Sequence, residues 1–205
     1  MVIKRSAFFC YTILMAKILI GIIVVIVVLV GGFFWLNNYI YQEKQGDGGG
    51  EETAPPTYTS EKYGISFSYP STYQLSEREA PGSALREHHT ITLMRTVDLP
   101  APEGGEGPPA ISIDVYQNDL DKQTTEGWIQ GSNDSNFKLS QEQRLASTII
   151  DGKPALSYRW SGLYEGTTIA LAQPDWIYAF TVTYLQPGAD IVQDFVALRG
   201  SVRIR

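Results

Sequence analysis

An uncharged apolar run near the N-terminus constrains this chain more than any other feature. Residues Ile18 to Leu36 read "ILIGIIVVIVVLVGGFFWL" and include no charged side chain. About 20 apolar residues in a helix cross the roughly 30 Å hydrocarbon core of a bilayer. We therefore expect a transmembrane helix over 18–36, which makes the membrane the first expected partner of the chain.

A cleavable secretory signal peptide is the competing interpretation of this run. The apolar region of a signal peptide is usually about 7–15 residues long and precedes small residues at the cleavage site. This run is longer, and the bulky side chains of Trp35, Tyr39 and Tyr41 stand where small ones are needed. Aromatic residues of this kind are typical of a membrane interface, so the pattern favours an uncleaved anchor. Translation from Met15 instead of Met1 is a further open alternative, and it would omit Cys10, the only cysteine.

The charges on the two sides of the run predict its orientation. Lys4, Arg5 and Lys17 precede it, while the other 13 of the 16 Lys and Arg follow it with all 22 Asp and Glu, a net charge of −9. Cationic flanks stay in the cytoplasm, so we expect the N-terminus inside the cell and the rest of the chain outside the cell membrane. An acidic exterior part argues against nucleic-acid binding.

Four segments follow from this organisation. Residues 1–17 form a short cytoplasmic N-terminus, 18–36 the transmembrane helix, 37–57 a juxtamembrane segment and flexible linker, and 58–205 an extracytoplasmic domain. The stretch "QEKQGDGGGEETAPPT" at 42–57 has no apolar face, so it predicts a solvated tether that reaches on the order of 20 Å.

Apolar alternation predicts strands in the domain. In "EKYGISFSYPSTYQLSE", Ile65, Phe67 and Tyr69 alternate with small residues, and we expect a hairpin with the short strand that follows. Asp151-Gly152 is a two-residue turn pair between apolar runs, which predicts a second hairpin. The predicted strands are Ile65–Tyr69, Thr90–Arg95, Ala110–Tyr116, Leu145–Ile150, Ala155–Trp160, Thr167–Ala172 and Trp176–Tyr184. The last has apolar residues on both faces, so we expect it to be central.

Two helices should cover the sheet. Ile191, Phe195 and Leu198 repeat at helical spacing between Asp190 and Arg199-Gly200, and a shorter helix is predicted near "KQTTEGWIQGS". Strands in hairpin order with a terminal helix predict an α+β fold, an antiparallel sheet flanked by helices.

Three segments carry a resemblance to a known family: "YGISFSYPSTYQL", "DGKPALSYRW" and "DIVQDFVALRGSVRI". Together with the element order over 58–204 they resemble the PsbP/Mog1-like α/β/α sandwich family, in the form of a membrane-anchored bacterial-type extracytoplasmic domain. The resemblance implies a PsbP-like sandwich. It implies no activity, because members range from photosystem subunits to small GTPase partners and bacterial lipoproteins.

The candidate catalytic and metal-binding groups do not converge in the sequence. His88 and His89 are the only histidines, and neighbours in a strand point to opposite faces, so they should not share a metal. We expect both at an exposed strand start. Two carboxylate pairs, Glu77 with Glu79 and Asp119 with Asp121, are interpreted as solvated turn groups, with Asp119 as a helix cap. No catalytic, cofactor-binding or metal residue and no cofactor is predicted.

Aromatic residues give the other candidate site. Trp128, Trp160 and Tyr164 have the stacking surface that lines ligand grooves, although a core position is the favoured interpretation of Trp160.

The leading functional hypothesis is a non-enzymatic, single-pass membrane protein whose exterior domain binds an envelope protein or a small ligand. One alternative is an extracytoplasmic enzyme that uses Asp114 or Asp119 with His88 or His89, which requires those groups in one pocket. The other alternative is a purely structural envelope protein.

Overall fold

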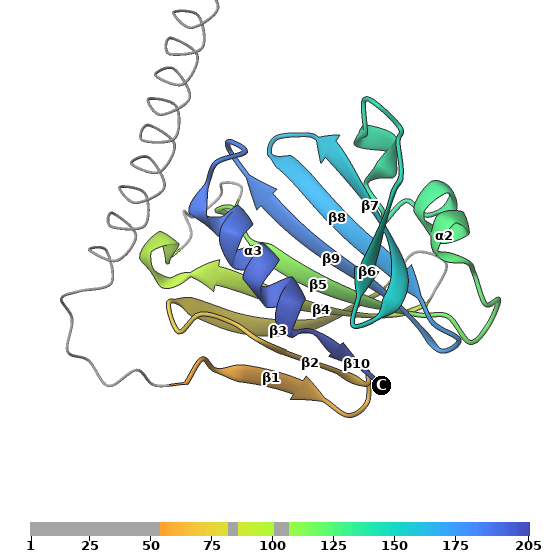
Figure 1. The fold of residues 1–205 in the computed structure, drawn as a ribbon, viewed down its shortest axis with the longest axis horizontal. Coiled ribbons are helices and arrows are strands. Elements are labelled where there is room, and N and C mark those ends of the chain that lie inside the picture. Colours follow the sequence, from red (N-terminus) through yellow and green to blue (C-terminus); the bar gives the residue numbers. More distant parts are fainter. Residues whose placement is uncertain (1–53, 82–85, 101–106) are drawn as a thin grey trace, which may run out of the picture. The chain divides into compact units, whose positions relative to one another are not determined.

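A seven-stranded antiparallel sheet is the centre of the fold (Figure 1). The computed structural model describes residues 54–81, 86–100 and 107–205. The predicted cytoplasmic segment, the predicted span and most of the tether lie outside these ranges. In the ranges that are described, no helix has the length and apolar character to cross a membrane.

The strands of this sheet follow one another in space in the order β3 (Tyr73–Pro81), β4 (Glu87–Arg95), β5 (Ile111–Gln117), β9 (Trp176–Tyr184), β8 (Glu165–Ala172), β7 (Lys153–Ser161) and β6 (Ala146–Ile150). The central position predicted for β9 is confirmed, because it pairs with β5 on one side and β8 on the other. The hairpin predicted at Asp151-Gly152 is also confirmed, with φ of 47° and 72° at the two residues. All seven predicted strands are present, with ends that differ by a few residues.

A second, three-stranded sheet has the order β1 (Thr57–Ser60), β2 (Ile65–Ser68) and β10 (Arg203–Ile204). The prediction that β2 forms a hairpin with the next strand, β3, is wrong. Strand β2 pairs with β1 and β10, whereas β3 pairs with β4. Gly64 has a φ of +60°, a value suited to glycine, and turns the chain from β1 into β2. After Pro70 a tight turn, closed by the Tyr73 N–H on the Pro70 carbonyl, leads into the larger sheet.

Two α-helices are described, α2 (Thr125–Gly131) and α3 (Asp190–Ser201), with short 3-10 turns η2 (Thr96–Asp98) and η3 (Phe137–Leu139). Helix α3 buries Ile191, Phe195 and Leu198, as their spacing predicted. The cap predicted at Asp119 is wrong: Thr124 caps α2, and its hydroxyl accepts the N–H of Gly127 at 3.1 Å.

The two faces of the large sheet carry separate cores. Strand β9 directs Phe180 and Val182 toward the core under α3 and the small sheet, and directs Ile177 and Ala179 toward the core that contains Trp128 of α2. Successive side chains of a strand alternate between faces, so the large sheet is the middle layer between these two sets of elements. The α+β class and the helices on the sheet are as predicted.

Candidate functional site

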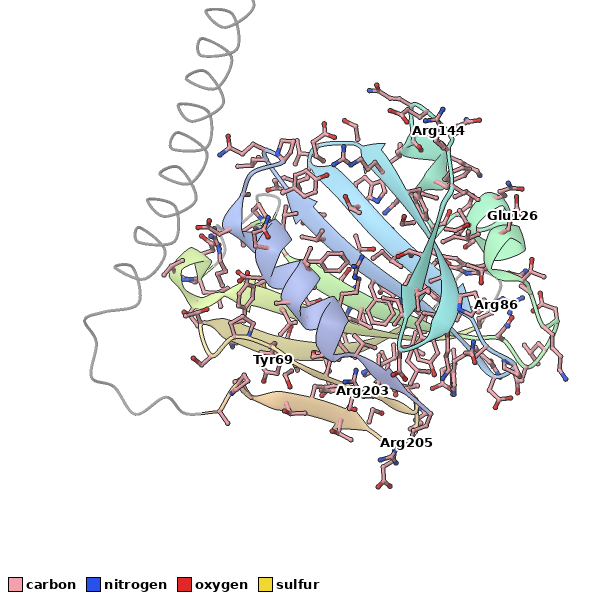
Figure 2. All side chains as sticks on the ribbon, viewed as in Figure 1. Tyr69, Arg86, Glu126, Arg144, Arg203 and Arg205 are labelled. Atoms are coloured by element: carbon pink, nitrogen blue, oxygen red, sulfur yellow. The ribbon has the colours of Figure 1, made fainter. Side chains whose placement is uncertain are left out.

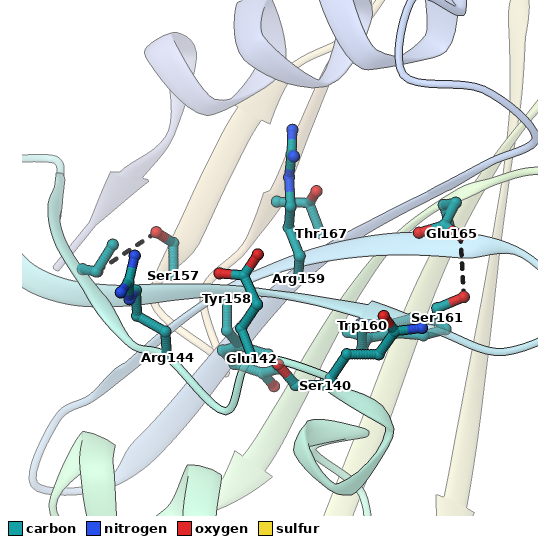
Figure 3. Close-up of a pocket in the computed structure, with 12 residues that line it drawn as sticks. Ser140, Glu142, Arg144, Ser157, Tyr158, Arg159, Trp160, Ser161, Glu165 and Thr167 are labelled. Atoms are coloured by element: carbon teal, nitrogen blue, oxygen red, sulfur yellow. Dashed lines mark hydrogen bonds between the residues drawn. The ribbon is translucent and has the colours of Figure 1, made fainter.

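The clearest candidate site is a pocket at the edge of the large sheet, along strand β7 (Figure 3). Strand β8 pairs with β7 as far as Ser161, but β6 pairs with it only as far as Ser157. Residues 140–145 between η3 and β6 belong to no strand, and a pocket of about 450 Å³ lies between the 140–146 segment and β7–β8. We call this pocket the β7 groove.

The inner surface of the β7 groove includes two aromatic rings, Tyr158 and Trp160. The Tyr158 hydroxyl donates to the Ser135 carbonyl, and Trp160 Nε1–H donates to Thr168 Oγ1 at 3.0 Å. Burial raises the pKa of Tyr158, so its phenol stays neutral. The polar atoms of both rings are already bonded inside the protein, and Tyr158 is 3% and Trp160 9% exposed, so the rings form an apolar and mostly buried base of the groove.

The rim of the β7 groove is charged. Arg144 and Glu142 come from the 140–146 segment, and Arg159 and Glu165 come from β7 and β8 (Figure 3). Glu165 accepts a hydrogen bond from the Ser161 hydroxyl at 2.9 Å. By contrast, no carboxylate of the described residues forms an ion pair with Arg144 or Arg159. Two guanidinium groups are therefore available to a ligand.

Of the three aromatic residues singled out in the sequence, only Trp160 lines the β7 groove. Trp160 lines the β7 groove and is also 9% exposed, so both interpretations of it apply. Trp128, on α2, is buried in the hydrophobic cluster that also contains Trp160. Tyr164 does not line the groove, and its hydroxyl donates to the Gly107 carbonyl at 2.7 Å.

His88 lies in a small polar cluster on the face of the sheet that carries Tyr116. His88 Nε2 is 2.8 Å from Asp114 Oδ1 and 3.0 Å from Thr90 Oγ1, and Thr90 donates to the same Asp114 oxygen at 2.7 Å. The structure thus joins His88 to Asp114 but leaves Asp119 exposed in the loop after β5. A catalytic relay uses one imidazole nitrogen for the nucleophile and the other for the carboxylate. In this cluster both neighbours share Nε2, so it lacks that arrangement.

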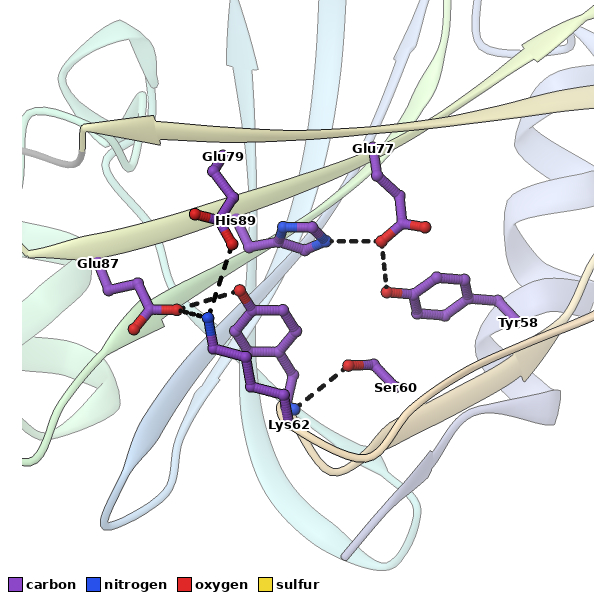
Figure 4. Close-up of polar contacts among 8 residues, drawn as sticks. Tyr58, Ser60, Lys62, Glu77, Glu79, Glu87 and His89 are labelled. Atoms are coloured by element: carbon purple, nitrogen blue, oxygen red, sulfur yellow. Dashed lines mark hydrogen bonds and ion pairs between the residues drawn. The ribbon is translucent and has the colours of Figure 1, made fainter.

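His89 points to the opposite face, as strand alternation predicted, but its expected exposure is wrong. It is 6% exposed, because the ring of Tyr63 stacks on it at 4.6 Å. Its Nε2 lies 3.0 Å from Glu77 Oε2, which also accepts the Tyr58 hydroxyl at 2.9 Å (Figure 4). Its Nδ1 is buried without a hydrogen-bond partner among the described residues. The cause of this burial is the packing of β1–β2 over β3–β4.

An ion-pair network surrounds this histidine. Lys62 Nζ is 2.5 Å from Glu87 and 3.6 Å from Glu79 (Figure 4). Lys62 holds the pKa of Glu87 below its usual value. Burial, with the hydrogen bond to Glu77, raises the pKa of Tyr58 to about 12. The carboxylates predicted as solvated turn groups therefore lie on strand β3, where Glu77 binds His89 and Glu79 binds Lys62.

The second predicted carboxylate pair also separates. Asp121 pairs with Arg86, which lowers the pKa of that carboxyl group, whereas Asp119 stands apart from this contact. Across the described ranges, no group of three His, Cys, Asp or Glu is placed to hold a metal ion.

The described unit is therefore an α+β domain in which an antiparallel sheet is covered on both faces and carries a groove at its edge. The sequence matches no protein-family model and no curated protein. Similar solved structures include the cyanobacterial PsbP protein (CyanoP) from Synechocystis sp. PCC 6803, at 13% identity and a TM-score of 0.49, over 78% of this chain and 98% of that one.

A protein from Bacteroides thetaiotaomicron is similar at 10% identity and a TM-score of 0.47, over 74% of this chain. This chain spans about half of that protein's length, since 48% of it is covered. The first of these structures is a PsbP protein, and the sequence segments resemble the same family.

Proposed function

We propose that this chain is a single-pass membrane protein whose PsbP-like domain lies outside the cytoplasm and binds a partner through the β7 groove, without catalysis. The observation that carries the binding role is the groove itself. It joins aromatic surface to two guanidinium groups that have no carboxylate partner in the described chain, and a pocket with a few convergent polar groups is the usual form of a binding site. The apolar run at 18–36 and the charges around it support the anchor and its orientation.

Photo-crosslinking in the native membrane tests the binding role. A photoreactive amino acid at position 144 of the full chain should give a discrete crosslinked product, whereas the same group at position 196, an exposed site on α3, should not. Absence of any product at 144, with expression equal at both positions, would refute the binding role. That outcome would favour the structural alternative, which has no need of the groove.

Protease accessibility tests the orientation. Protease added to spheroplasts should digest the chain after Gln42 and leave the N-terminus intact. Complete protection of the domain, while an exterior control protein is cleaved, would contradict the proposed topology.

A further inference from the structure

We infer that the β7 groove takes an extended peptide that pairs with the free edge of β7 and presents acidic side chains to Arg159 and Arg144. This inference rests on the proposed binding role of the same groove and specifies the chemistry of the ligand.

The hydrogen-bond alternation of the β6–β7 hairpin identifies the free backbone groups. A two-residue turn makes Ile150↔Lys153 a hydrogen-bonded pair, and bonded and non-bonded pairs then alternate along an antiparallel ladder. Pro154, which has no N–H, accordingly falls on a non-bonded pair. Ala146↔Ser157 is again a bonded pair, and it is the last pair that β6 forms.

The same alternation continues beyond the end of β6. Arg159 and Ser161 direct their N–H and C=O groups toward the side that β6 has left, whereas Tyr158 and Trp160 direct theirs toward β8. The N–H of Gly162 donates a hydrogen bond to the carbonyl of Tyr164. Gly162 therefore points toward the β8 side, as the alternation requires for the residue after Ser161. Across the described chain, no backbone hydrogen bond reaches Arg159 or Ser161 from the open side. These groups form a template for one added strand.

The side chains around the edge define what the added strand must carry. Side chains alternate across a strand, so Arg159 and Ser161 lie on one face of β7 and the rings of Tyr158 and Trp160 on the other. The residues of an added peptide would therefore alternate between two positions. The first position faces the guanidinium groups, and the second faces the rings. Acidic residues suit the first position because a guanidinium binds a carboxylate with two parallel hydrogen bonds, and apolar residues suit the second.

The rim charges distinguish a peptide from other anions. Glu142 and Glu165 line the same groove as the two arginines, so the groove has a balanced charge rather than a cationic one. A ligand with a phosphate at every unit would be repelled by these carboxylates. A peptide with an acidic residue at every second position places its charge at the arginines and its apolar side chains on the rings.

Calorimetric titration of the detergent-solubilised full chain with a short synthetic peptide tests the inference. The probe is a capped hexapeptide of alternating valine and glutamate, and the matched control peptide replaces glutamate with glutamine. We expect the glutamate peptide to bind about tenfold more tightly than the glutamine peptide, a difference of about 1.4 kcal/mol. The double variant Arg144→Gln, Arg159→Gln should lose this preference, and both side chains are exposed, so the fold should be retained.

Two further peptides, each N-methylated on the amides of alternate residues so that one edge cannot donate, test strand pairing. They are methylated in the two opposite phases and should bind unequally. Equal binding by both, no binding of the glutamate peptide, or an affinity unchanged in the double variant would overturn the inference. If crosslinking at position 144 succeeds while the peptides fail, the binding role stands and the peptide assignment is refuted.

Discussion

The contact between Gly166 and Trp160 allows the most direct test of the groove's architecture. A Cβ atom added at Gly166 would lie 2.2 Å from Trp160 Cε2, 2.3 Å from Cζ2 and 2.6 Å from Cδ2. These atoms belong to the middle of the indole ring, so a small rotation cannot relieve the clash. Gly166→Ala should therefore displace Trp160 from its place above strand β8.

The cost of this substitution has two parts. Forcing a methyl group into a packed site costs about 1–3 kcal/mol. Displacement of the indole also breaks its hydrogen bond to Thr168, which adds about 1 kcal/mol. The backbone adds no penalty of its own, since the φ of Gly166 lies outside the left-handed region. We expect Gly166→Ala to lower the free energy of unfolding by about 2–4 kcal/mol.

Urea unfolding of four proteins provides the measurement: the wild type, Gly166→Ala, Trp160→Ala and the double variant. In the Trp160→Ala background the three heavy atoms nearest to the added methyl group are absent, so Gly166→Ala should cost little there, and the cycle isolates the contact. Gly131→Ala is the matched control, because no heavy atom lies within 4 Å of its added Cβ and alanine favours the helix. An equal cost of Gly166→Ala in both backgrounds would refute the packing argument.

Three further predictions concern the core, the buried histidine and alkaline stability. Phe180→Ala should lower the free energy of unfolding by about 3–5 kcal/mol, whereas Val196→Ala on the surface of α3 should change it by less than about 0.5 kcal/mol; equal thermal melts would contradict the core assignment. His89→Ala should lower the free energy of unfolding by about 2 kcal/mol, because a ring stack and a hydrogen bond are lost. A urea midpoint equal to that of the wild type would contradict a stabilising role of His89. Because the folded-state pKa of Tyr58 is raised to about 12, the neutral phenol stabilises the fold fully below pH ~10, and this stability is lost as pH rises through 12. Urea midpoints from pH 9 to 12 should fall less steeply in Tyr58→Phe, and a slope equal to that of the wild type would contradict a role for phenol ionisation.

Local pattern predicts the parts of this fold that depend on neighbours in sequence. Alternation located the strands, the Asp151-Gly152 pair fixed one hairpin, and helical spacing identified the buried face of α3. The partners of β2 depend instead on distant segments. Strand β10 has only two residues, Arg203 and Ile204, and β1 has no apolar alternation, so neither leaves a periodic signal.

The site was less predictable because it arises from strand ends and from packing between sheets. Alternation correctly separated His88 from His89, but the burial of His89 depends on Tyr63 from the unpredicted small sheet. Arg144 and Arg159 are isolated in sequence and carry no motif. One signal was present in the sequence. The two-residue turn at Asp151-Gly152 sets the register of the predicted hairpin. The predicted strand that starts at Leu145 is too short to pair with the end of the next predicted strand, which extends to Trp160, so the end of that strand has no partner.

The two outer sides of the large sheet differ in a way that bears on specificity. Strand β3, at one side, presents three consecutive exposed charges in Glu77–Glu79 and ends at Pro81, features that discourage pairing with another chain. The free part of β7, at the other side, has Arg159 as its only charge, and the 140–146 segment forms the opposite wall of the groove. Arg144, from this wall, lies across the molecule from Arg203 of strand β10 and from Arg205, which follows it (Figure 2). A recessed edge of this kind has room for one extended chain and excludes the flat edge of a second sheet, so it favours a peptide over self-association.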